Sequence, residues 1–270
     1  IEAAAIPGFI RMTKRQHPGL HPLANGTYAW LAPQGSWGWS NAGLIVDGEE
    51  SLLIDTLYDL QLTGEMLRKM RAAEPAANTI GTLVNTHANG DHCHGNELVA
   101  GAQIIASTAS AMEMGDLPPE TMAAIMHSTP GLGPLGEYLQ HCFGQFRFDS
   151  IQFTPPTRTF DDTMDLRVGD KMVHLIEVGP AHTRGDVLVH CPSDRVVFTG
   201  DILFIDSTPV MWQGPVANWI KACLLIEEMD TELIIPGHGP ITDKHGVAKV
   251  RHYLQYIHDQ ARSRFDAGLS

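Results

Sequence analysis

Two histidines and an aspartate gather in one short segment, Thr86-His87-Ala88-Asn89-Gly90-Asp91-His92. Two imidazoles and a carboxylate within six positions can reach one centre only where the backbone turns sharply. Gly90 has the conformational freedom that such a turn needs. Imidazole and carboxylate together are typical ligands of zinc or iron. The segment therefore predicts a metal site.

Three further pieces of the chain carry the same chemistry: Ala181-His182-Thr183, Thr199-Gly200-Asp201 and Pro236-Gly237-His238-Gly239. Each follows or ends an apolar run, in turn Val173–Val178, Val196–Phe198 and Leu233–Ile235. Short apolar runs bounded by glycine and proline are typical of strands, so each piece is expected at a strand end. One His-x-Asn-x-Asp-His run would be a weak signal, whereas four pieces in this order are a strong one.

These pieces resemble the signature of the metallo-β-lactamase superfamily, which is Thr-His-x-His-x-Asp-His, then a distant His, a Gly-Asp and a Gly-His. The resemblance covers nearly the whole chain. It implies an α/β fold, the four-layer αββα sandwich of this family, with one or two metal ions. The resemblance assigns the metal ligands as His87 and His182 in a first site, Asp91, His92 and His238 in a second, and Asp201 as the bridge.

The chain departs from the family pattern at Asn89, which stands where the family has its second histidine. An amide oxygen is a neutral, harder and weaker donor than imidazole, so we expect weaker zinc binding at the first site. Three arrangements are open. Only the second site is filled, or Asn89 still ligates and favours a harder metal, or His94 replaces the missing imidazole. We rank them in that order, because His94 is expected at a helix start that directs it elsewhere.

The chemistry expected of this centre is hydrolysis. A bound metal lowers the pKa of its water towards about 7, which makes hydroxide the expected nucleophile. Asp91 is the expected catalytic residue, since its carboxylate can orient that water or relay its proton. Zinc is the expected cofactor, as one or two ions, with iron or manganese as alternatives. Thr183 and Asp186 follow His182 closely and are candidate hydrogen-bond partners for it.

The family resemblance also limits the substrate. Asp201 stands where several of the best-known β-lactamases have cysteine, and it agrees with the glyoxalase II-like, lactonase-like and thioesterase-like members. The expected enzyme is therefore a metallo-hydrolase of a small, moderately hydrophobic ester, lactone or thioester. One alternative is a non-hydrolytic iron or manganese enzyme, oxygen-using or lyase-type. Another is a metal-poor binding protein that lost its activity with the histidine.

Aromatic residues and methionines are the candidates for contacts with the substrate. Residues 34–41 form a glycine-broken loop, which in the family overhangs the metals. Tryptophans on such a loop favour an apolar substrate, although a cap on the core is nearly as well supported. Residues 117–159 are long for a connection, which favours a lid over an added helical pair. The candidate substrate contacts are Trp37, Trp39, Met122, Met126, Phe146 and Trp212.

The elements that must position these residues follow from the apolar spacing. Strands are expected at Tyr28–Leu31, Leu44–Val46, Leu52–Ile54, Ile80–Val84, Ile104–Ile105, Val173–Val178, Val187–His190, Val196–Phe198 and Leu233–Ile235. Helices are expected at Asp59–Arg71, Ala217–Met229 and Val247–Arg262. We predict a single metallo-β-lactamase-like domain over residues 1–270, built of two similar halves.

Composition limits the partners. The 270 residues carry a net charge of −13, which argues against nucleic acid. No apolar run approaches the roughly 20 residues that span a bilayer, so a soluble protein without a membrane partner is expected. The expected partner is a small-molecule substrate. Four widely spaced cysteines favour reduced thiols in a cytoplasmic enzyme. Secretion stays open because the first residue is Ile1, and the sequence predicts no oligomeric state.

Overall fold

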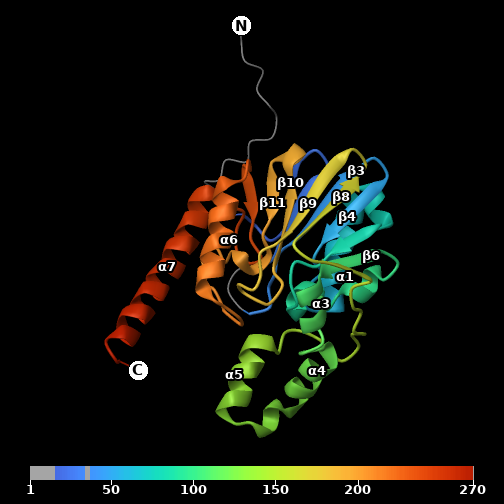
Figure 1. Ribbon diagram of the computed structural model, residues 1–270. Helices are drawn as coiled ribbons and strands as arrows, with labels where there is room; N and C mark the ends of the chain where they lie inside the picture. Colours follow the sequence, from blue (N-terminus) through green and yellow to red (C-terminus); the bar gives the residue numbers. More distant parts are fainter. Residues whose placement is uncertain (1–15, 34–36, 270) are drawn as a thin grey trace.

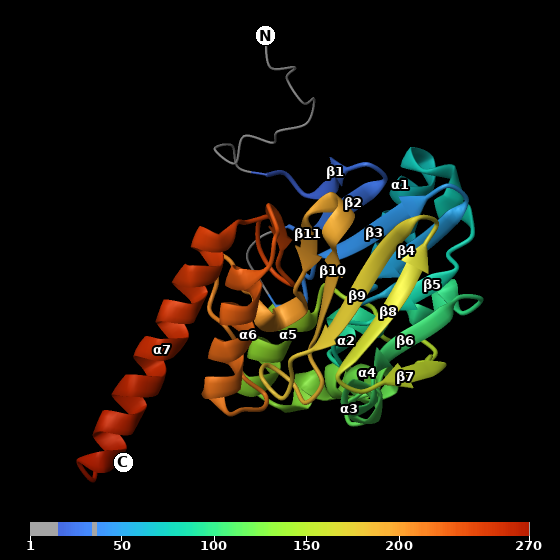
Figure 2. The same ribbon diagram turned by 45° about the horizontal axis from the view of Figure 1, so that its top comes forward.

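The computed structural model describes residues 16–33 and 37–269. Two β-sheets lie face to face, and helices cover their outer faces (Figure 1; Figure 2). This arrangement is the four-layer αββα sandwich that the sequence predicted. Residues 34–36, part of the predicted tryptophan-bearing loop, lie outside the described residues.

The first sheet has seven strands that lie side by side in chain order. They are β1 (Gly19–Ala24), β2 (Thr27–Leu31), β3 (Ala42–Asp47), β4 (Glu50–Ile54), β5 (Thr82–Val84), β6 (Gln103–Ser107) and β7 (Arg158–Phe160). The pairs up to β3–β4 are antiparallel, and those from β4 to β7 are parallel. The carboxyl ends of β4 to β7 therefore meet at one edge, where the His87 segment begins.

The second sheet has five strands in the order β12-β11-β10-β9-β8. They are β8 (Thr163–Val168), β9 (Lys171–Glu177), β10 (Val187–Cys191), β11 (Val196–Phe198) and β12 (Leu233–Ile235). Only β11 and β12 are parallel. Strands β9, β11 and β12 each end shortly before one of the predicted ligands, so this sheet also delivers its ligands from strand ends.

The core between the sheets is built from side chains of both. Ile54 and Val84 come from the first sheet, and Val173, Leu175 and Val189 come from the second; all are almost completely buried. In β9 the burial alternates, with Val173 and Leu175 inside and the intervening residue on the opposite face. This alternation is the ordinary period of a strand with one face in the core.

Helices complete the outer layers. They are α1 (Leu60–Ala73), α2 (Gly90–Cys93), α3 (Thr108–Glu113), α4 (Pro119–Ser128), α5 (Pro134–Phe143), α6 (Val216–Glu228) and α7 (Lys244–Asp266), with 3-10 turns at Pro75–Asn78, Asn96–Val99, Thr129–Gly131, Pro192–Asp194 and Gly200–Ile202. Helices α6 and α7 pack on the second sheet, and α1 packs on the first. No helix in the described part of the chain is long and apolar enough to cross a membrane.

The long connection between α3 and β7 holds two helices, α4 and α5, at one end of the molecule (Figure 1). Its buried side chains form a cluster with a residue that follows β4. We call this group the aromatic cluster; its members are Tyr58, Met122, Phe146, Phe148 and Ile151. The cluster joins the connection to the end of the first sheet.

All nine expected strands and all three expected helices are present. Strands β11 and β12 have the expected bounds, and the ends of the others are shifted. Strands β1, β7 and β8 and helix α3 were not predicted from the sequence. Helices α4 and α5 form the helical pair that was ranked second to a lid, and His94, which was expected at a helix start, is instead the C-cap of α2. Strand β1 contains Pro22, and β7 has only three residues, so both give weak signals. Strand β8 alternates in burial, but its outward residues are exposed because it lies at the edge of its sheet.

Candidate metal centre

The segment after β5 presents His87 from the loop that precedes α2, and Asp91 and His92 from the single helical turn of α2. Asn89 stands at the N-cap of α2, but its side chain makes no capping hydrogen bond. Its Oδ1 instead lies 2.7 Å from Nε2 of His182. Gly90 acts through its missing side chain, since a Cβ there would lie 2.4 Å from the ring of His94. Close packing rather than backbone freedom therefore explains this glycine.

The other predicted ligands come from the second sheet. His182 lies in the loop after β9, Asp201 in the 3-10 turn after β11, and His238 in the loop after β12. Gly237 allows the last two loops to touch, because a Cβ on it would lie 1.9 Å from Oδ1 of Asp201. The two sheets thus bring ligand-type side chains from distant parts of the chain to one place.

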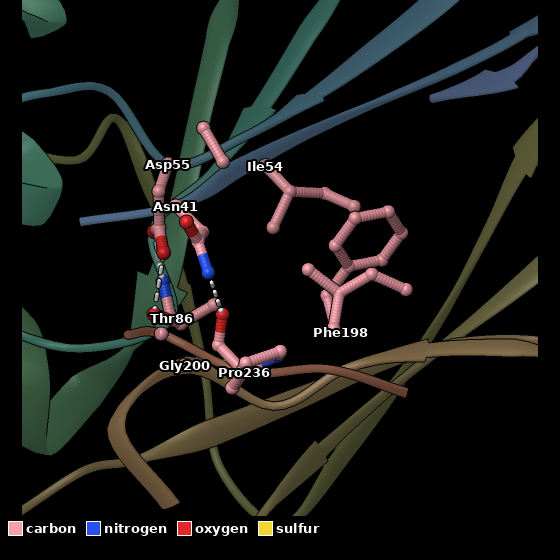
Figure 3. A pocket seen from close by; sticks show the side chains of 10 residues that line it. Asn41, Ile54, Asp55, Thr86, Phe198, Gly200 and Pro236 are labelled. Atoms are coloured by element: carbon pink, nitrogen blue, oxygen red, sulfur yellow. Dashed lines mark hydrogen bonds between the residues drawn. The ribbon is translucent and has the colours of Figure 1, made fainter. Parts of the chain in front are cut away.

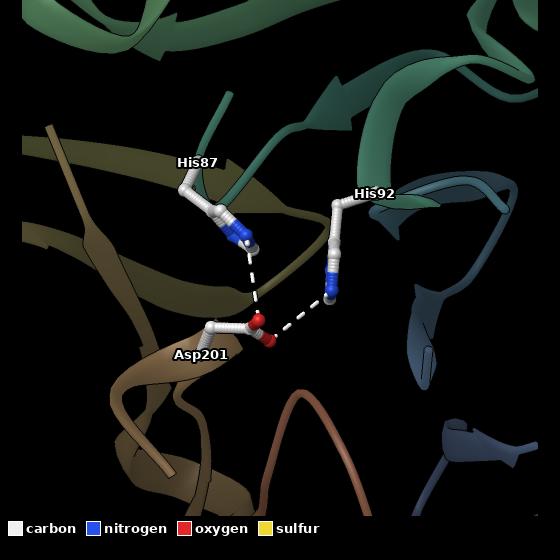
Figure 4. Close-up of side chains that lie close together, drawn as sticks. All are labelled: His87, His92 and Asp201. Atoms are coloured by element: carbon white, nitrogen blue, oxygen red, sulfur yellow. Dashed lines mark ion pairs between the residues drawn. The ribbon is translucent and has the colours of Figure 1, made fainter. Parts of the chain in front are cut away.

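Four imidazoles converge on the carboxylate of Asp201. Its Oδ2 lies 3.2 Å from Nε2 of His238, 3.3 Å from Nε2 of His182 and 3.7 Å from Nε2 of His87. Its Oδ1 lies 3.2 Å from Nε2 of His92. Figure 4 shows His87 and His92 pointing toward Asp201 from different directions. Asp201 therefore stands at the middle of the group, as a bridging ligand would.

Two sets of side chains hold their ligand atoms within 4.8 Å of one another, namely His87, His92 and Asp201, and Asp91, His92 and His238. In the second set, Oδ2 of Asp91 lies 3.5 Å from Nε2 of His238 and 3.9 Å from Nε2 of His92. His92 belongs to both sets, whereas the resemblance gave it to the second site alone.

The residues fit a metal ion. Nε2 of His87, Nε2 of His92 and Oδ1 of Asp201 are buried, and none has a hydrogen-bond partner within the described residues. Buried polar atoms are rarely left in this state, because each costs free energy comparable to a lost hydrogen bond. A cation between these nitrogen and oxygen atoms would satisfy them together. Imidazoles and carboxylates are the donor set of zinc and iron.

The outer nitrogens of the four imidazoles make the hydrogen bonds that orient metal ligands. Nδ1 of His92 lies 2.8 Å from Oδ2 of Asp55, and Nδ1 of His87 lies 3.1 Å from Oγ1 of Thr86. Nδ1 of His182 lies 2.5 Å from the carbonyl oxygen of Val210, and Nδ1 of His238 lies 2.9 Å from the carbonyl oxygen of Trp39. All four Nε2 atoms are thereby left to face the centre.

The expectation for Thr183 and Asp186 was wrong. The carboxylate of Asp186 accepts hydrogen bonds from the backbone N–H and the hydroxyl of Thr183, at 2.9 and 2.8 Å. His182 takes its partner from the loop after β11 instead. The pair therefore shapes the loop that carries His182, and it does not contact the ring.

Comparison with known proteins identifies the family. The family model described as "Metallo-beta-lactamase superfamily" matches residues 35–238. The chain belongs to this superfamily. Its fold is similar to that of a metallo-beta-lactamase from Pontibacter korlensis, with a TM-score of 0.65 and 17% identity over 88% of this chain and 99% of the other. The DIM-1 metallo-beta-lactamase is similar too, at a TM-score of 0.64 and 16% identity over 89% and 99%.

Several curated relatives are thioesterases by name. Acyl-coenzyme A thioesterase MBLAC2 from Homo sapiens is 26% identical over 211 residues, which are 74% of this chain and 72% of the relative. The protein of the same name from Gallus gallus is 23% identical over 229 residues, which are 80% and 79%. A beta-lactamase-like protein 2 homolog from Caenorhabditis elegans is 28% identical over 96 residues, which are 36% and 31%.

Two residues that build the site, Asp55 and Asn41, were not predicted from the sequence. Asp55 is buried, has a φ of 60°, and accepts hydrogen bonds from the N–H and hydroxyl of Thr86, both at 2.7 Å, besides its contact with His92. Nδ2 of Asn41 donates to the carbonyl of Pro236 at 2.9 Å and so holds the loop before His238. Asp55 follows the strand-like run Leu52–Ile54, the same signal that located the other ligands.

Asp55 and Asn41 face a small cavity between the sheets (Figure 3). Its volume is about 10 Å³, and Thr86, Gly200 and Pro236 also line it. A space of this size is at the lower limit for one water molecule. The cavity lies behind the ligands and offers no room for a substrate.

Electrostatics favour a mixed protonation state when no metal is bound. Burial by itself raises the pKa of Asp201, but the imidazoles around it hold this pKa well below its usual value. Burial alone would lower the pKa of His92, yet Asp201, Asp91 and Asp55 hold it well above the usual value. Burial, together with nearby imidazoles, lowers the pKa of His87. A carboxylate anion and a histidine cation therefore share the centre.

His94 does not join this group. The residue is 5% exposed, and its ring packs against Tyr58 and Phe148, with ring centroids 5.4 and 6.2 Å away. Burial lowers its pKa to about 4. His94 lies two residues beyond His92, which places the two on opposite sides of a helical turn. The structure thus gives no support to the arrangement in which His94 replaces the missing imidazole.

The candidate substrate residues fall into two groups. Trp37 and Trp212 are 39% and 56% exposed, and their rings lie 6.5 Å apart. The ring centroids of Trp37 and Phe143 of α5 lie 6.1 Å apart, in an edge-to-face arrangement. The loop of Trp212 adjoins the centre directly, because its backbone N–H donates to the carbonyl of His182.

The second group lies deeper than expected. Met122 and Phe146 are 4% and 6% exposed, as members of the aromatic cluster. Met126 and Trp39 are half-buried and pack against that cluster. Met122 and Phe146 therefore support the connection from inside in this structure, and they offer a ligand almost no surface.

Proposed function

We propose that this protein is a metal-dependent hydrolase that cleaves a small, moderately hydrophobic acyl thioester. The convergence of four imidazoles on Asp201, with buried ligand atoms left unpartnered, carries the proposal. The thioester is preferred over the ester and the lactone because the superfamily relatives from Homo sapiens and Gallus gallus are named acyl-coenzyme A thioesterases.

The ligands we propose are the predicted ones. Asp91, His92, His238 and Asp201 would hold one ion, and His87, His182 and Asp201, with Asn89 as a weak fourth donor, would hold another. We propose zinc first, because imidazole predominates in the donor set. Bound there, the ion would act as a Lewis acid that polarises the thioester carbonyl and activates water at neutral pH.

Asp91 is the residue we propose to move the proton. Its Oδ2 faces His238 and His92, and its side chain is 14% exposed, so it lies at the border between the centre and solvent. The oxygen of the attacking water joins the acyl carbon, and the carbon–sulfur bond breaks. The Asp91 carboxylate would accept the proton from that water and pass it to the departing thiolate.

Trp37 and Trp212 would provide the apolar surface for the acyl group. They lie at the side of the centre bordered by the connection 117–159, which we propose acts as a lid. Contact with an acyl chain would contribute roughly 25 cal/mol per Å² of buried apolar surface. We propose a cytoplasmic enzyme, because the four cysteines are buried and free.

The test is hydrolysis of acyl-coenzyme A by metal-depleted protein before and after addition of zinc, iron or manganese. We expect release of free thiol that depends on metal, and a higher kcat/KM for a long acyl chain than for acetyl. Absence of turnover of thioesters, esters and lactones with every metal would overturn the proposal. Oxygen consumption by the iron-loaded protein would then favour the non-hydrolytic alternative.

A further inference from the structure

A second group of histidines lies on the outer face of the five-stranded sheet. His174 in β9 stands directly opposite Asp165 in β8 and directly opposite His190 in β10. Side chains that face each other across neighbouring strands lie on the same side of the sheet. The three residues therefore form one row, although they lie far apart in the chain, and no sequence motif joins them.

The row begins under the helices and ends in solvent. Beyond His190 it continues through Val197 and Ile234, which are fully buried under α6 and α7. His190 is half-buried, and the side chain of His174 is 37% exposed. Figure 2 shows α6 and α7 over the β11 side of the sheet and β8 and β9 away from them. The two histidines lie where this cover stops, with His174 on the solvent side.

The geometry suits a shared ion. The ring centroids of His174 and His190 are 6.1 Å apart. A metal at the usual zinc–nitrogen distance lies roughly 3.2 Å from the centroid of each imidazole it binds, so two rings that share an ion stand about 5 Å apart at a tetrahedral angle and about 6.4 Å apart when they lie on opposite sides of the ion. The separation of His174 and His190 falls within this range, toward its wide end. In the candidate metal centre, the rings of His92 and His238 are 5.5 Å apart.

The hydrogen bonds leave ligand nitrogens available. Nδ1 of His174 contacts Oδ1 of Asp165 at 2.6 Å, the carboxylate–histidine arrangement that orients metal ligands and leaves Nε2 free. Nε2 of His190 is buried and has no hydrogen-bond partner in the described ranges 16–33 and 37–269. Burial and the neighbouring His174 lower the pKa of His190, which keeps its ring neutral.

We propose that His174 and His190 bind a transition-metal ion of the zinc, copper or nickel type, with Asp165 orienting His174 and water completing the coordination. The site shares no residue with the candidate metal centre and does not depend on the proposed function. Two imidazoles bind more weakly than a centre with a bridging carboxylate, so this ion would be the last to enter. A metal count per chain would then include one ion that Asn89 does not influence.

The test uses full-length protein whose candidate metal centre is already loaded with zinc. Further zinc is added in a calorimeter, and Cu²⁺ is added in a parallel sample for electron paramagnetic resonance. We expect the wild type to take up one more zinc ion, and His174→Asn and His190→Asn to lose it or bind it at least 10-fold more weakly. The Cu²⁺ spectrum of the wild type should show hyperfine coupling to nitrogens of two imidazoles. The spectrum of either variant should show coupling to one imidazole.

His127→Asn is the matched control. His127 is also exposed and bonded to a carboxylate, with Nε2 2.8 Å from Oδ1 of Asp149, but no second imidazole packs beside it within the described residues. It should bind zinc as the wild type does, and Asp165→Asn should bind about 10-fold more weakly. The proposal fails if both His174→Asn and His190→Asn keep the extra ion at unchanged affinity, or if His127→Asn loses it equally.

Discussion

At the scale of single residues, Asn89 has a side chain that reaches the centre without completing it. Its Oδ1 lies beside Nε2 of His182, and it makes no capping hydrogen bond to α2. An amide oxygen at this place is a weak substitute for an imidazole. The residues on the Asp91 side of the centre match the family pattern fully, so the departure affects one side only.

The first prediction is unequal metal occupancy. Zinc at limiting concentration should fill the site of Asp91, His92 and His238 before the site of His87 and His182, which anomalous scattering measures directly. Asn89→His should raise the affinity of the weaker site by roughly 10–100-fold, the range typical of changes around a metal. Asn89→Ala is the control that removes the amide alone. Two equally full sites in the wild type at low zinc would contradict the prediction.

The second prediction separates the two carboxylates. Asp201→Ala should abolish turnover and weaken metal binding, because all four imidazoles meet at this one carboxylate. Asp91→Asn should lower kcat by roughly 10²–10⁴-fold, the usual contribution of a positioned acid–base group, with a smaller loss of metal. Steady-state kinetics and metal analysis on the same samples check both. Near-normal kcat in Asp91→Asn would remove its proposed role.

The third prediction concerns Asp55, which acts through His92. Asp55→Asn keeps the size of the side chain but removes the carboxylate that orients the ring of His92 and that helps Asp201 and Asp91 to hold its pKa high. Metal affinity should fall by about 10–100-fold. A metal titration of the purified variant measures this loss. Unchanged affinity in a folded variant would show that the contact with His92 has no influence on the metal.

At the scale of elements, the sequence predicted the site through its strand ends. Apolar runs before His87, His182, Asp201 and His238 all proved to be strands, and ligands at strand ends meet because the sheets stack. The same logic would have found Asp55. The row of Asp165, His174 and His190 depends on strand register, which no local pattern contains.

Burial was harder to predict than position. Met122 and Phe146 lie in the connection that the sequence marked as a lid, yet they turn inward onto Tyr58. Apolar side chains in a short helical pair have to bury themselves against something, and the sequence does not say whether that is a ligand or the protein. Of the candidate substrate residues, Trp37 and Trp212 are the exposed ones.

The fourth prediction follows from this placement. Trp212→Ala should raise KM for a long-chain acyl thioester several-fold and change KM for a short one little, because only the long chain reaches the tryptophan. Tyr256→Ala is the control, since Tyr256 is 61% exposed on α7, which carries no predicted ligand. Assays of both variants with two chain lengths measure the difference. An equal rise in KM for both substrates would argue against an acyl contact.

At the scale of the whole molecule, the candidate centre joins the two sheets. His87, Asp91 and His92 follow the first sheet, whereas His182, Asp201 and His238 follow strands of the second. An ion held by both sets is bound by the folded chain and lost on unfolding. Binding free energy at such a site becomes folding free energy.

The fifth prediction is that metal raises the thermal stability of the entire fold. At zinc concentrations 100-fold above Kd the gain is about 2.7 kcal/mol, which for a chain of this size raises Tm by roughly 5–10 °C. Calorimetry of metal-depleted and reloaded protein measures it. Asp201→Ala should lose the shift, because the bridge between the sheets is gone. His174→Asn should keep the shift in Tm, since the ion proposed at that residue contacts the second sheet alone. Equal Tm values for the depleted and the reloaded wild type would contradict the prediction.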